Sequence, residues 1–472
     1  MNIHNIIIPV QFPHGLAAGD GGQFNVQVVA RNGIGEPVLR GTAVAGVLRS
    51  AFLNFTKSEQ QVSLLFGGIL EHDSSDLRAS HIRVYDSLLD TGAGSVSIRT
   101  HHLRNRHTKT VVDGGLFSLE ACPPQTTTCI RLQIKDDPDS PELDITHFLD
   151  CLEQQFSTGV VFGGNTARGI GVGKLDGAIL VKTYDLTDSN SYGEWLDDNL
   201  SEADPHSPPA GFTATNSTTD ELDRTDLLVI HTALQIPRGQ DILIADGMGL
   251  TRTMEPQRVR SANNEILWRI PGSSFRGMFK AWITRLAARE GLTVADSHDR
   301  YVAPDGASSE LKGDNLGWAF LPFEDRNQET AETDCPVSRL FGTAFEAGRI
   351  QFLDAMVTSQ LTDEEGNCEE EQLRKHVAID PISGGAVDGA FFENTVLTSH
   401  CHKQNESFDL EIRVMSPSED EVRWLCQALM ALHTGVLRIG SSKAAGRLEL
   451  ARAPAAVGPH AQLIDKHFQP LL

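Results

Sequence analysis

The spacing of apolar residues predicts the same run of elements twice along the chain. In the first half, helical spacing indicates a helix over Val44 to Phe55, an amphipathic helix over Ile145 to Gln155, and then a strand over Lys174 to Val181. The corresponding segments of the second half are helices over Phe275 to Glu290 and Glu419 to His433 and a strand over Leu448 to Ala451.

The order of these elements predicts the fold class. A strand, a helix, a middle section with hairpins, a second helix and a last strand form the layout of a ferredoxin-like α+β unit. Both helices of such a unit cover one face of an antiparallel sheet and leave the other face free. We therefore predict two ferredoxin-like domains in tandem.

Short sequence marks recur in the same order and support a duplication. They are a Gly-Thr or Gly-Ser element before a helix, a Leu-Phe-Gly, a strand ending in Asp, an Arg-x-His segment and a glycine-rich loop. Two similar units in line favour a long, repetitive ligand, which points first to a polymer. The marks are Gly41–Gly46, Leu65–Gly67, Ile82–Asp86, Arg99–His101 and Gly163–Gly171 in the first copy and Gly272–Gly277, Leu340–Gly342, Ile350–Asp354, Arg374–His376 and Ile439–Gly446 in the second.

Length and spacing set the expected domain boundaries. With 472 residues the chain is too long for one ordinary core, so we place a first domain at 1–185, an acidic Ser/Pro-containing linker at 186–225 and a second domain at 226–472. Gly41 to Phe66 is 25 positions while Gly272 to Phe341 is 69, which predicts an insertion in the second domain at about 292–336.

Composition predicts a cytoplasmic protein without a membrane partner. The chain is 40% hydrophobic and 22% charged, as in soluble globular proteins, and no apolar run approaches the roughly 20 residues that cross a bilayer. The segment Met1 to Asn5 lacks the basic start and long apolar stretch of a secretory signal.

Seven cysteines without a C-x-x-C pair argue against a disulfide framework and a four-cysteine zinc site. Cys122 and Cys129 could close a loop. His400 and His402 could hold a metal, but alternate residues of a strand point to opposite faces and two neighbouring ligands do not complete a coordination shell. We expect most of these cysteines to be small buried apolar side chains.

The net charge of −23 is unfavourable for binding a phosphate polymer, which normally meets a basic surface. Segregation of the acids would remove this conflict, and many of them lie in the expected loops at 136–139, 185–226 and 363–371. Basic residues gather instead in the repeated marks, as Arg99, Arg104, Arg106, Lys109 and Arg168 in the first copy and Arg269, Arg276, Lys280, Arg374, Lys375 and Lys443 in the second.

The glycine-rich loops run from a helix to a strand, opposite to a dinucleotide fingerprint. Glycine still permits tight turns that bring the backbone close to a ligand, and Arg168 and Lys443 lie where a phosphate could be met. A turn that needs glycine only for its geometry is the alternative for either loop. Repetition of the loop favours a function.

The segment Ile270–Gly277 is the most specific local signal. Its proline fixes the approach to the helix, and we expect a serine to supply the N-cap oxygen. Arg276 places a cation in the first turn, where the helix dipole prefers an anion, which indicates an anionic ligand nearby. Ala45 stands at the corresponding position of the first copy.

These motifs, with the Arg-x-His-x-x-Ile-Asp of the second copy, resemble the RAMP superfamily and, more narrowly, the backbone subunits of type III CRISPR effector complexes. The resemblance implies an RRM-like fold in each half and crRNA running along the stacked units, with target RNA and other effector subunits as partners. It also implies a protruding hairpin in each half, at about Leu103 to Gly115 and Val377 to Gly389, that kinks the guide–target duplex. Two units in one chain resemble the fused subunits of the type III-D branch.

From the motifs and the resemblance we expect RNA contacts from the glycine loops, the helix starts and the hairpin bases. The histidines of the hairpin bases are expected to stack on or hydrogen-bond to RNA. The candidate residues are Arg168, Gly164, Gly169, Lys443, Gly440, Ser273, Ser274, Arg276, Thr42, Arg49, Lys280, Arg99, His101, Arg104, Arg374 and His376.

Some family members cut target RNA with an acid in a loop upstream of the Pro-Gly-Ser-Ser element. The carry-over falls near Glu255, with Asp246 in the same loop and Asp20 in the first copy. Such an acid would take a proton or hold a divalent metal, Mg or Mn, while the kink aligns the ribose 2′-hydroxyl. Two alternatives stay open: a scaffold that does not cut RNA, and an enzyme that holds a nucleotide cofactor in its glycine loops.

Overall fold

The structure is a computed structural model of the chain. It describes residues 1–469 except 24–25, 70–76, 105–110, 137–144, 165, 199, 201–209, 216–223, 225, 246–253, 293, 295–334, 343–346, 359–370, 399–406 and 441–445. Most of the expected insertion at 292–336, the sequence His400–His402 and much of the acidic runs fall outside these residues.

The first domain is built around strand β1 (Asn2–Phe12). It pairs along its whole length with β11 (Thr126–Asp136) and on its other edge with β13 (Val172–Leu175) and β14 (Leu180–Asp185), all antiparallel. β7 (Ile82–Val84) pairs with the far edge of β11. The order β13, β1, β11, β7 is that of a ferredoxin-like sheet.

The second domain repeats this sheet around β16 (Leu227–Gln235). β24 (Phe408–Met415) lies on one side of β16, β25 (Glu449–Leu450) and β26 (Ala455–Val457) lie on the other, and β20 (Ile350–Phe352) pairs with β24. Together with its helices, this repeat confirms the predicted fold class of two ferredoxin-like units.

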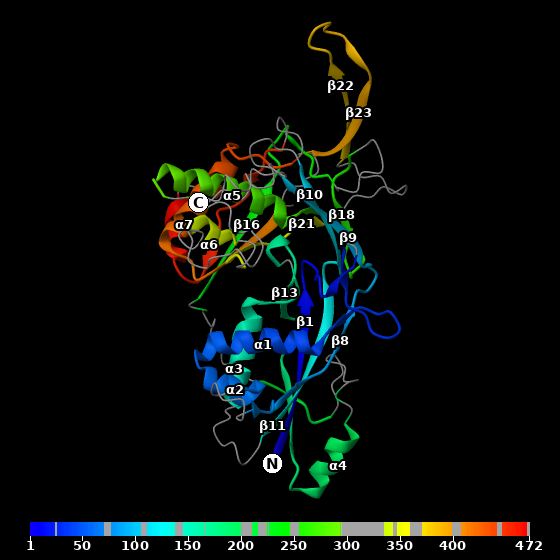
Figure 1. Cartoon of the computed structure of the whole chain (residues 1–472), viewed down its shortest axis with the longest axis vertical. Helices are drawn as coiled ribbons and strands as arrows, with labels where there is room; N and C mark the ends of the chain where they lie inside the picture. The colour runs from blue at the N-terminus through cyan, green and yellow to red at the C-terminus, as the bar shows by residue number, and fades with distance from the viewer. Residues whose placement is uncertain are drawn as a thin grey trace, which may run out of the picture.

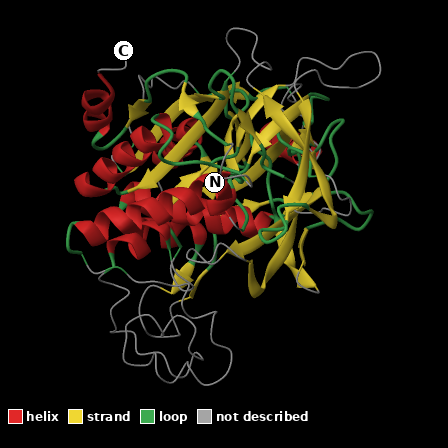
Figure 2. Ribbon diagram, turned by 90° about the horizontal axis from the view of Figure 1, so that it is seen from above, coloured by secondary structure: helices red, strands yellow, loops and turns green. Residues whose placement is uncertain are grey.

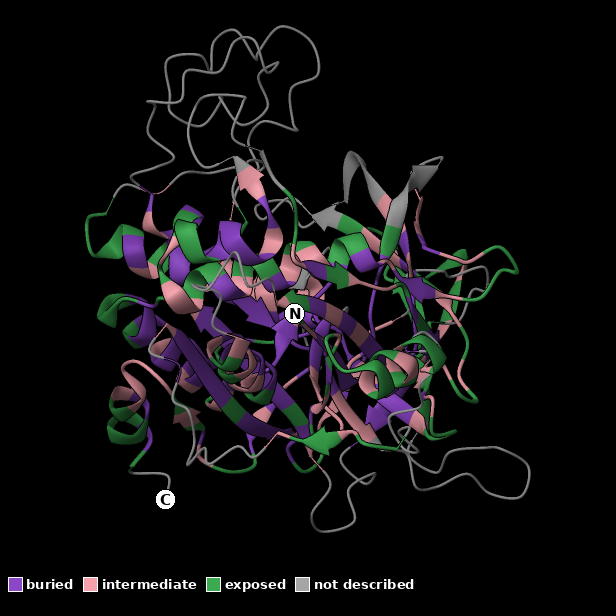
Figure 3. Ribbon diagram, turned by 90° about the horizontal axis from the view of Figure 1, so that it is seen from below, coloured by how far each residue is buried: buried purple, intermediate pink, exposed green. Residues whose placement is uncertain are grey.

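The helices that cover the two main sheets lie on the same side of the molecule (Figures 1 and 2), whereas α4 (Ser189–Asp197) lies apart from them at the lower end of Figure 1. In the first unit, alternate residues of β1 such as Ile6 and Ile8 pack against Leu48 of α1 and Leu152 of α3. The corresponding core of the second unit lies under α5 and α7, and the purple central strands of Figure 3 mark these buried layers. The helices are α1 (Gly41–Thr56), α2 (Glu59–Phe66), α3 (Ile145–Thr158), α4 (Ser189–Asp197), α5 (Gly272–Arg289), α6 (Pro336–Phe341), α7 (Glu419–His433) and α8 (Ala461–Phe468), with a 3-10 turn η1 (Thr166–Arg168).

Each unit carries a β-hairpin outside its main sheet. β9 (Ser97–Arg104) and β10 (Val111–Ala121) form the first, and β22 (Glu371–Ile379) and β23 (Ala386–Thr398) the second. The second protrudes from the body at the top of Figure 1. Both hairpins include more of the chain than predicted, because the Arg-x-His segments belong to their first strands. The remaining strands are β2 (Gly19–Gln23), β3 (Val26–Val29), β4 (Val38–Leu39), β5 (Gly68–Ile69), β6 (Leu77–Arg78), β8 (Ser87–Asp90), β12 (Val160–Val161), β15 (Thr213–Ala214), β17 (Asp241–Ile242), β18 (Arg258–Arg260), β19 (Ile266–Ile270) and β21 (Ala355–Thr358).

The starts of α1 and α5 explain why the repeated strands end in Asp. Oδ1 of Asp86 accepts a hydrogen bond from the Gly41 N–H at 2.7 Å, and Oδ1 of Asp354 accepts one from the Gly272 N–H at 2.9 Å. The expectation of a serine N-cap for α5 was wrong, since Pro271 is the N-cap residue and makes no side-chain cap. A carboxylate from a neighbouring strand satisfies the helix N-terminus instead.

Two other expectations need correction, and one open alternative is resolved. The strand predicted over Lys174 to Val181 is two strands separated by a turn at Gly177, whose φ of 133° favours glycine. The possible bridge between Cys122 and Cys129 is not formed, and both side chains are buried, as expected for most of the cysteines. The predicted free face of the first sheet is partly covered, because Leu200 and Phe212 pack there against Ile7.

Among the described residues, no helix is long and apolar enough to cross a membrane.

Candidate nucleic-acid interface

The glycine-rich loop of the first unit contacts the helix start of the second. The Asp354 N–H donates to the Gly169 carbonyl at 3.0 Å, and a side chain at Gly169 would place its Cβ 1.9 Å from Oδ1 of Asp354. Gly169 also has a φ of 98°. Here glycine is required both for the positive φ and for the close approach of the two backbones.

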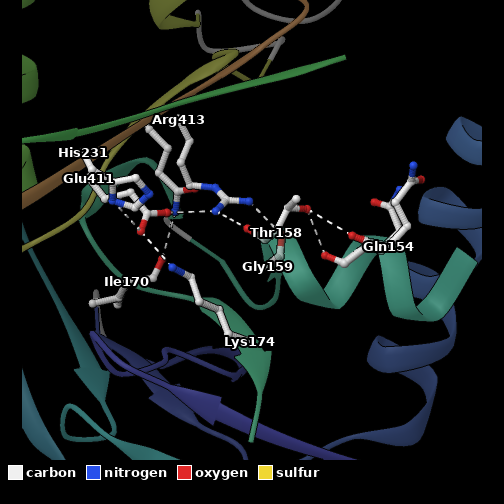
Figure 4. Close-up of polar contacts among 10 residues, drawn as sticks. Gln154, Thr158, Gly159, Ile170, Lys174, His231, Glu411 and Arg413 are labelled. Carbon is white, nitrogen blue, oxygen red and sulfur yellow. Dashed lines mark hydrogen bonds and ion pairs between the residues drawn. The ribbon is translucent and has the colours of Figure 1, made fainter. Parts of the chain in front are cut away.

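A second cluster of polar contacts joins the two domains at the same interface (Figure 4). Arg413 of β24 donates to the carbonyls of Thr158 and Gly159 at 2.6 and 2.7 Å, which satisfies the C-terminal end of α3. Lys174 of β13 donates to Glu411 at 2.9 Å, and Glu411 is only 7% exposed. Charge-assisted bonds between buried groups therefore fix how the two units sit together.

An aromatic and cationic stack lies on the first hairpin, beside the same loop. His101 of β9 and Phe117 of β10 face each other across the strands with ring centroids 5.4 Å apart, in a stacked arrangement. The guanidinium carbon of Arg168 lies 4.2 Å from the centroid of the Phe117 ring. Nε2 of His101 is buried and has no hydrogen-bond partner among the described residues.

Two arginines from different units lie near each other here, because η1, which contains Arg168, packs against α5, which contains Arg276. Burial and then the nearby charge of Arg276 lower the pKa of Arg168 to about 10. Burial also lowers the pKa of Arg276, whose guanidinium lies 5.8 Å over the Phe341 ring and donates to the Phe341 carbonyl. Neither arginine forms an ion pair with a carboxylate in the described part of the chain.

Burial and the neighbouring arginines keep the His101 imidazole neutral. Burial and the charges of Arg168, Arg99 and Arg269 lower the pKa of His101 to about 4. The imidazole is therefore uncharged near neutral pH, and it can accept or donate one hydrogen bond through Nε2 according to its tautomer.

The second hairpin repeats the pair of stacked rings. His376 of β22 and Phe392 of β23 occupy the same relative register, with centroids 5.0 Å apart. Phe392 is 40% exposed and Phe391 53%. An exposed aromatic surface on a protruding strand pair suits stacking on a planar ligand.

The other predicted site residues fall into three groups. Arg99 belongs to the interdomain interface, where it pairs with Asp354, and Arg374 pairs within its own domain with Asp241. Thr42 and Arg49 are exposed on α1, while Ser273, Ser274 and Lys280 are half-buried on α5, and Gly164 and Gly440 shape the ends of the glycine loops. The Arg104 side chain and Lys443 lie outside the described residues.

Of the three candidate acids, the structure describes the side chain of Glu255 alone, which is exposed. Its position is fixed by neighbours, because Met254 bridges Asn394 at the base of the second hairpin and Pro256 bridges Ala245. Asp246 and the Asp20 side chain lie outside the described residues. No group of three or more His, Cys, Asp or Glu side chains that could hold a metal occurs among the described residues, so these residues do not define a metal site.

Sequence reasoning missed the roles of five residues that shape the site. Asp86 and Asp354 were visible as strand-terminal acids, but their contacts with helix starts come from distant segments. Phe117 lies 16 positions after His101, as Phe392 does after His376, and this shared spacing could have revealed the pair. Arg413 gave no signal, since it is one of three charged residues that alternate with apolar residues along β24, as in any strand with one polar face.

Comparison with known proteins agrees with the duplicated geometry. The model of the RAMP superfamily matches residues 15–174 and again residues 252–449. No curated protein matches the chain. The two matched regions contain both glycine loops and both hairpins, and the chain therefore belongs to the RAMP superfamily, whose CRISPR-associated RNA-binding role it shares, with two RAMP domains in tandem.

Proposed function

We propose that this chain is a crRNA-binding backbone subunit of a type III CRISPR ribonucleoprotein, resembling the fused subunits of the type III-D branch. The observation that carries the proposal is the proximity of Arg168 and Arg276 at the interdomain interface. Two like charges without a carboxylate partner among the described residues favour an anion between or beside them, and an RNA phosphate provides that charge.

The hairpins support an RNA ligand rather than a free anion. Each carries a stacked His and Phe at the same register, and base stacking on aromatic rings is sequence-tolerant. A backbone subunit must accept any guide sequence. The buried interdomain contacts would keep the two hairpins at a fixed separation, as a protein that spaces a guide–target duplex requires.

We further propose cleavage of target RNA near the second hairpin. Glu255 stands beside the base of β23, where a kinked target strand would pass, and it is exposed. With Asp246, it would accept a proton from the attacking 2′-hydroxyl or help to hold a divalent metal, Mg or Mn. In the first unit Asp20 takes the corresponding part. The alternative is a scaffold that binds RNA without cutting it.

Binding of single-stranded RNA to the purified chain at several salt concentrations tests the RNA proposal. We expect Arg168→Ala to weaken binding and to reduce the salt slope by about 1, as loss of one phosphate contact does. The matched control is Arg423→Ala, because Arg423 is an arginine on the outer surface of α7 that pairs with Asp420. Equal affinity of both variants and wild type would overturn the assignment of this site. A nucleotide that co-purifies without RNA would favour a cofactor enzyme instead.

A further inference from the structure

Hydrogen bonds that recur in both units identify equivalent positions at the interdomain interface and at the outer ends of the chain. The N–H of Gly171 donates to the carbonyl of Gly15 at 2.9 Å, and the N–H of Gly446 donates to that of Asp241 at 2.7 Å. Gly15 and Asp241 are therefore equivalent.

The helix starts give the second equivalence. Gly41 donates to Oδ1 of Asp86 as Gly272 does to Oδ1 of Asp354. The residue before the glycine is Arg40 in the first unit and Pro271 in the second. These two residues have nearly the same backbone conformation, with φ of −64° and −60° and ψ of 133° and 136°.

At the interdomain interface, the second carboxylate oxygen receives an arginine from the neighbouring unit. Arg99 donates to Oδ2 of Asp354 at 2.6 Å, and this pair is 5% and 0% exposed. Pro271 and Gly15 have no charged side chain that could compete for either partner.

At the outer ends, both charges are satisfied within their own unit. Arg40 donates to Oδ2 of Asp86 at 3.0 Å, on the surface of the first domain that corresponds to the acceptor side of the interface. Arg374, which corresponds to Arg99, donates to Oδ2 of Asp241 at 2.7 Å. Both pairs stay partly exposed. The side chains of Arg40 and Asp86 are 37% and 52% exposed, and those of Arg374 and Asp241 are 47% and 20% exposed.

We propose that Arg40 and Asp241 prevent the two outer faces of the chain from binding a second copy of the chain. The N-terminal outer face, around Gly41 and Asp86, keeps the helix start and strand end of the interdomain interface. The C-terminal outer face, around Gly440 and Arg374, keeps its hairpin arginine and glycine turn. On the N-terminal face Arg40 neutralises Asp86, and on the C-terminal face Asp241 neutralises Arg374. Neither face therefore offers an unpaired charge to the other.

Burial gives the physical reason for this exclusion. A contact between two copies would bring Arg40, Asp86, Arg374 and Asp241 into a space that holds one ion pair at the interdomain interface. Two further charged side chains would have to be desolvated there without room for additional partners, which costs more than one shared ion pair returns. An interface that adds a unit in one direction does not close on itself, so an uncapped chain would extend into a filament.

Sedimentation velocity on nuclease-treated, RNA-free protein tests the proposal independently of RNA binding. Arg40→Pro opens the acceptor face, and its φ already suits proline. Asp241→Gly opens the donor face. Wild type and each single variant should sediment as one chain, whereas an equimolar mixture of the two variants should form a particle of two chains. The double variant should form longer, concentration-dependent species.

Further variants separate this outcome from misfolding. Asp241→Asn also removes the carboxylate that pairs with Arg374. It is used in place of Asp241→Gly if the glycine variant unfolds at a lower temperature than wild type. Adding Asp86→Asn to Arg40→Pro should abolish the two-chain particle, because the acceptor carboxylate is lost. A mixture that stays at one chain at every concentration, or wild type that associates as readily as the double variant, would overturn the proposal.

Discussion

Arg99 and Asp354 form an ion pair between the two domains, with Nη1 and Oδ2 2.6 Å apart and both side chains buried. The other oxygen of Asp354 caps α5 through Gly272. Through its carboxylate and its backbone N–H, Asp354 thus joins the base of the first hairpin, the glycine loop of the first unit and the first helix of the second unit.

Arg99→Ala should lower the free energy of unfolding by about 3–5 kcal/mol, because it leaves a buried carboxylate without its partner. Arg40→Ala removes the corresponding arginine from a partly exposed pair and should cost no more than about 1 kcal/mol. Urea denaturation followed by circular dichroism measures both. Equal losses for the two variants would show that burial of the interdomain pair is unimportant.

Gly272→Ala should destabilise the chain by about 1–3 kcal/mol, since the added Cβ would lie 2.0 Å from the carbonyl oxygen of Phe352. Gly277→Ala in the same helix meets nothing within 4 Å and should stabilise it by up to about 1 kcal/mol. Thermal melting compares the two variants. A neutral Gly272→Ala would mean that the helix start can move away from β20.

Glu411 should make the stability of the interface depend on pH. Burial opposes its ionisation, but Lys174 and Arg413 outweigh burial and lower its pKa from 4.5 to about 2. A carboxyl with a depressed pKa stabilises the fold fully above pH 4.5, and this contribution is lost as the pH falls toward 2. The shift corresponds to roughly 3 kcal/mol.

Unfolding by urea between pH 2 and 6 measures this dependence. Glu411→Gln should be less stable than wild type near neutral pH and should lose less stability on acidification. Parallel profiles for the two proteins would contradict the role given to Glu411.

Phe392→Ala should weaken RNA binding by about 1–3 kcal/mol if one base stacks on the second hairpin. Leu373→Ala, at a 52% exposed position on the opposite face of β22, is the matched control and should bind as wild type does. Fluorescence anisotropy with a guide–target duplex gives both affinities. Equal weakening by both variants would indicate a general loss of hairpin structure.

Glu255→Gln and Asp246→Asn should both remove the product of the second unit, and Asp20→Asn should remove that of the first, if both units cut target RNA. Replacing a carboxylate by an amide preserves its size but removes the base, so duplex binding should be unchanged. Gel analysis of labelled target fragments, with the duplex affinity as control, tests each acid. Persistence of every fragment in all three variants would favour the non-catalytic scaffold.

Local sequence patterns predicted the elements well. Helices expected over Val44 to Phe55 and Glu419 to His433 are found as α1 and α7, because their apolar spacing is set within the segment itself. The turn at Gly177 and the cover of Ile7 by Leu200 were missed. Both depend on which residues meet across the sheet rather than on local periodicity.

Periodicity and repetition along the chain are sufficient to predict the duplication, the ferredoxin-like order of elements and the residue types at the hairpins. What the equivalent residues do depends instead on tertiary contacts. Arg99 crosses to the other domain while Arg374 stays in its own, because Gly15 leaves the first arginine without a local carboxylate and Asp241 provides one for the second. Such partners are fixed by contacts between distant segments, where burial and the few available counter-charges select one pairing.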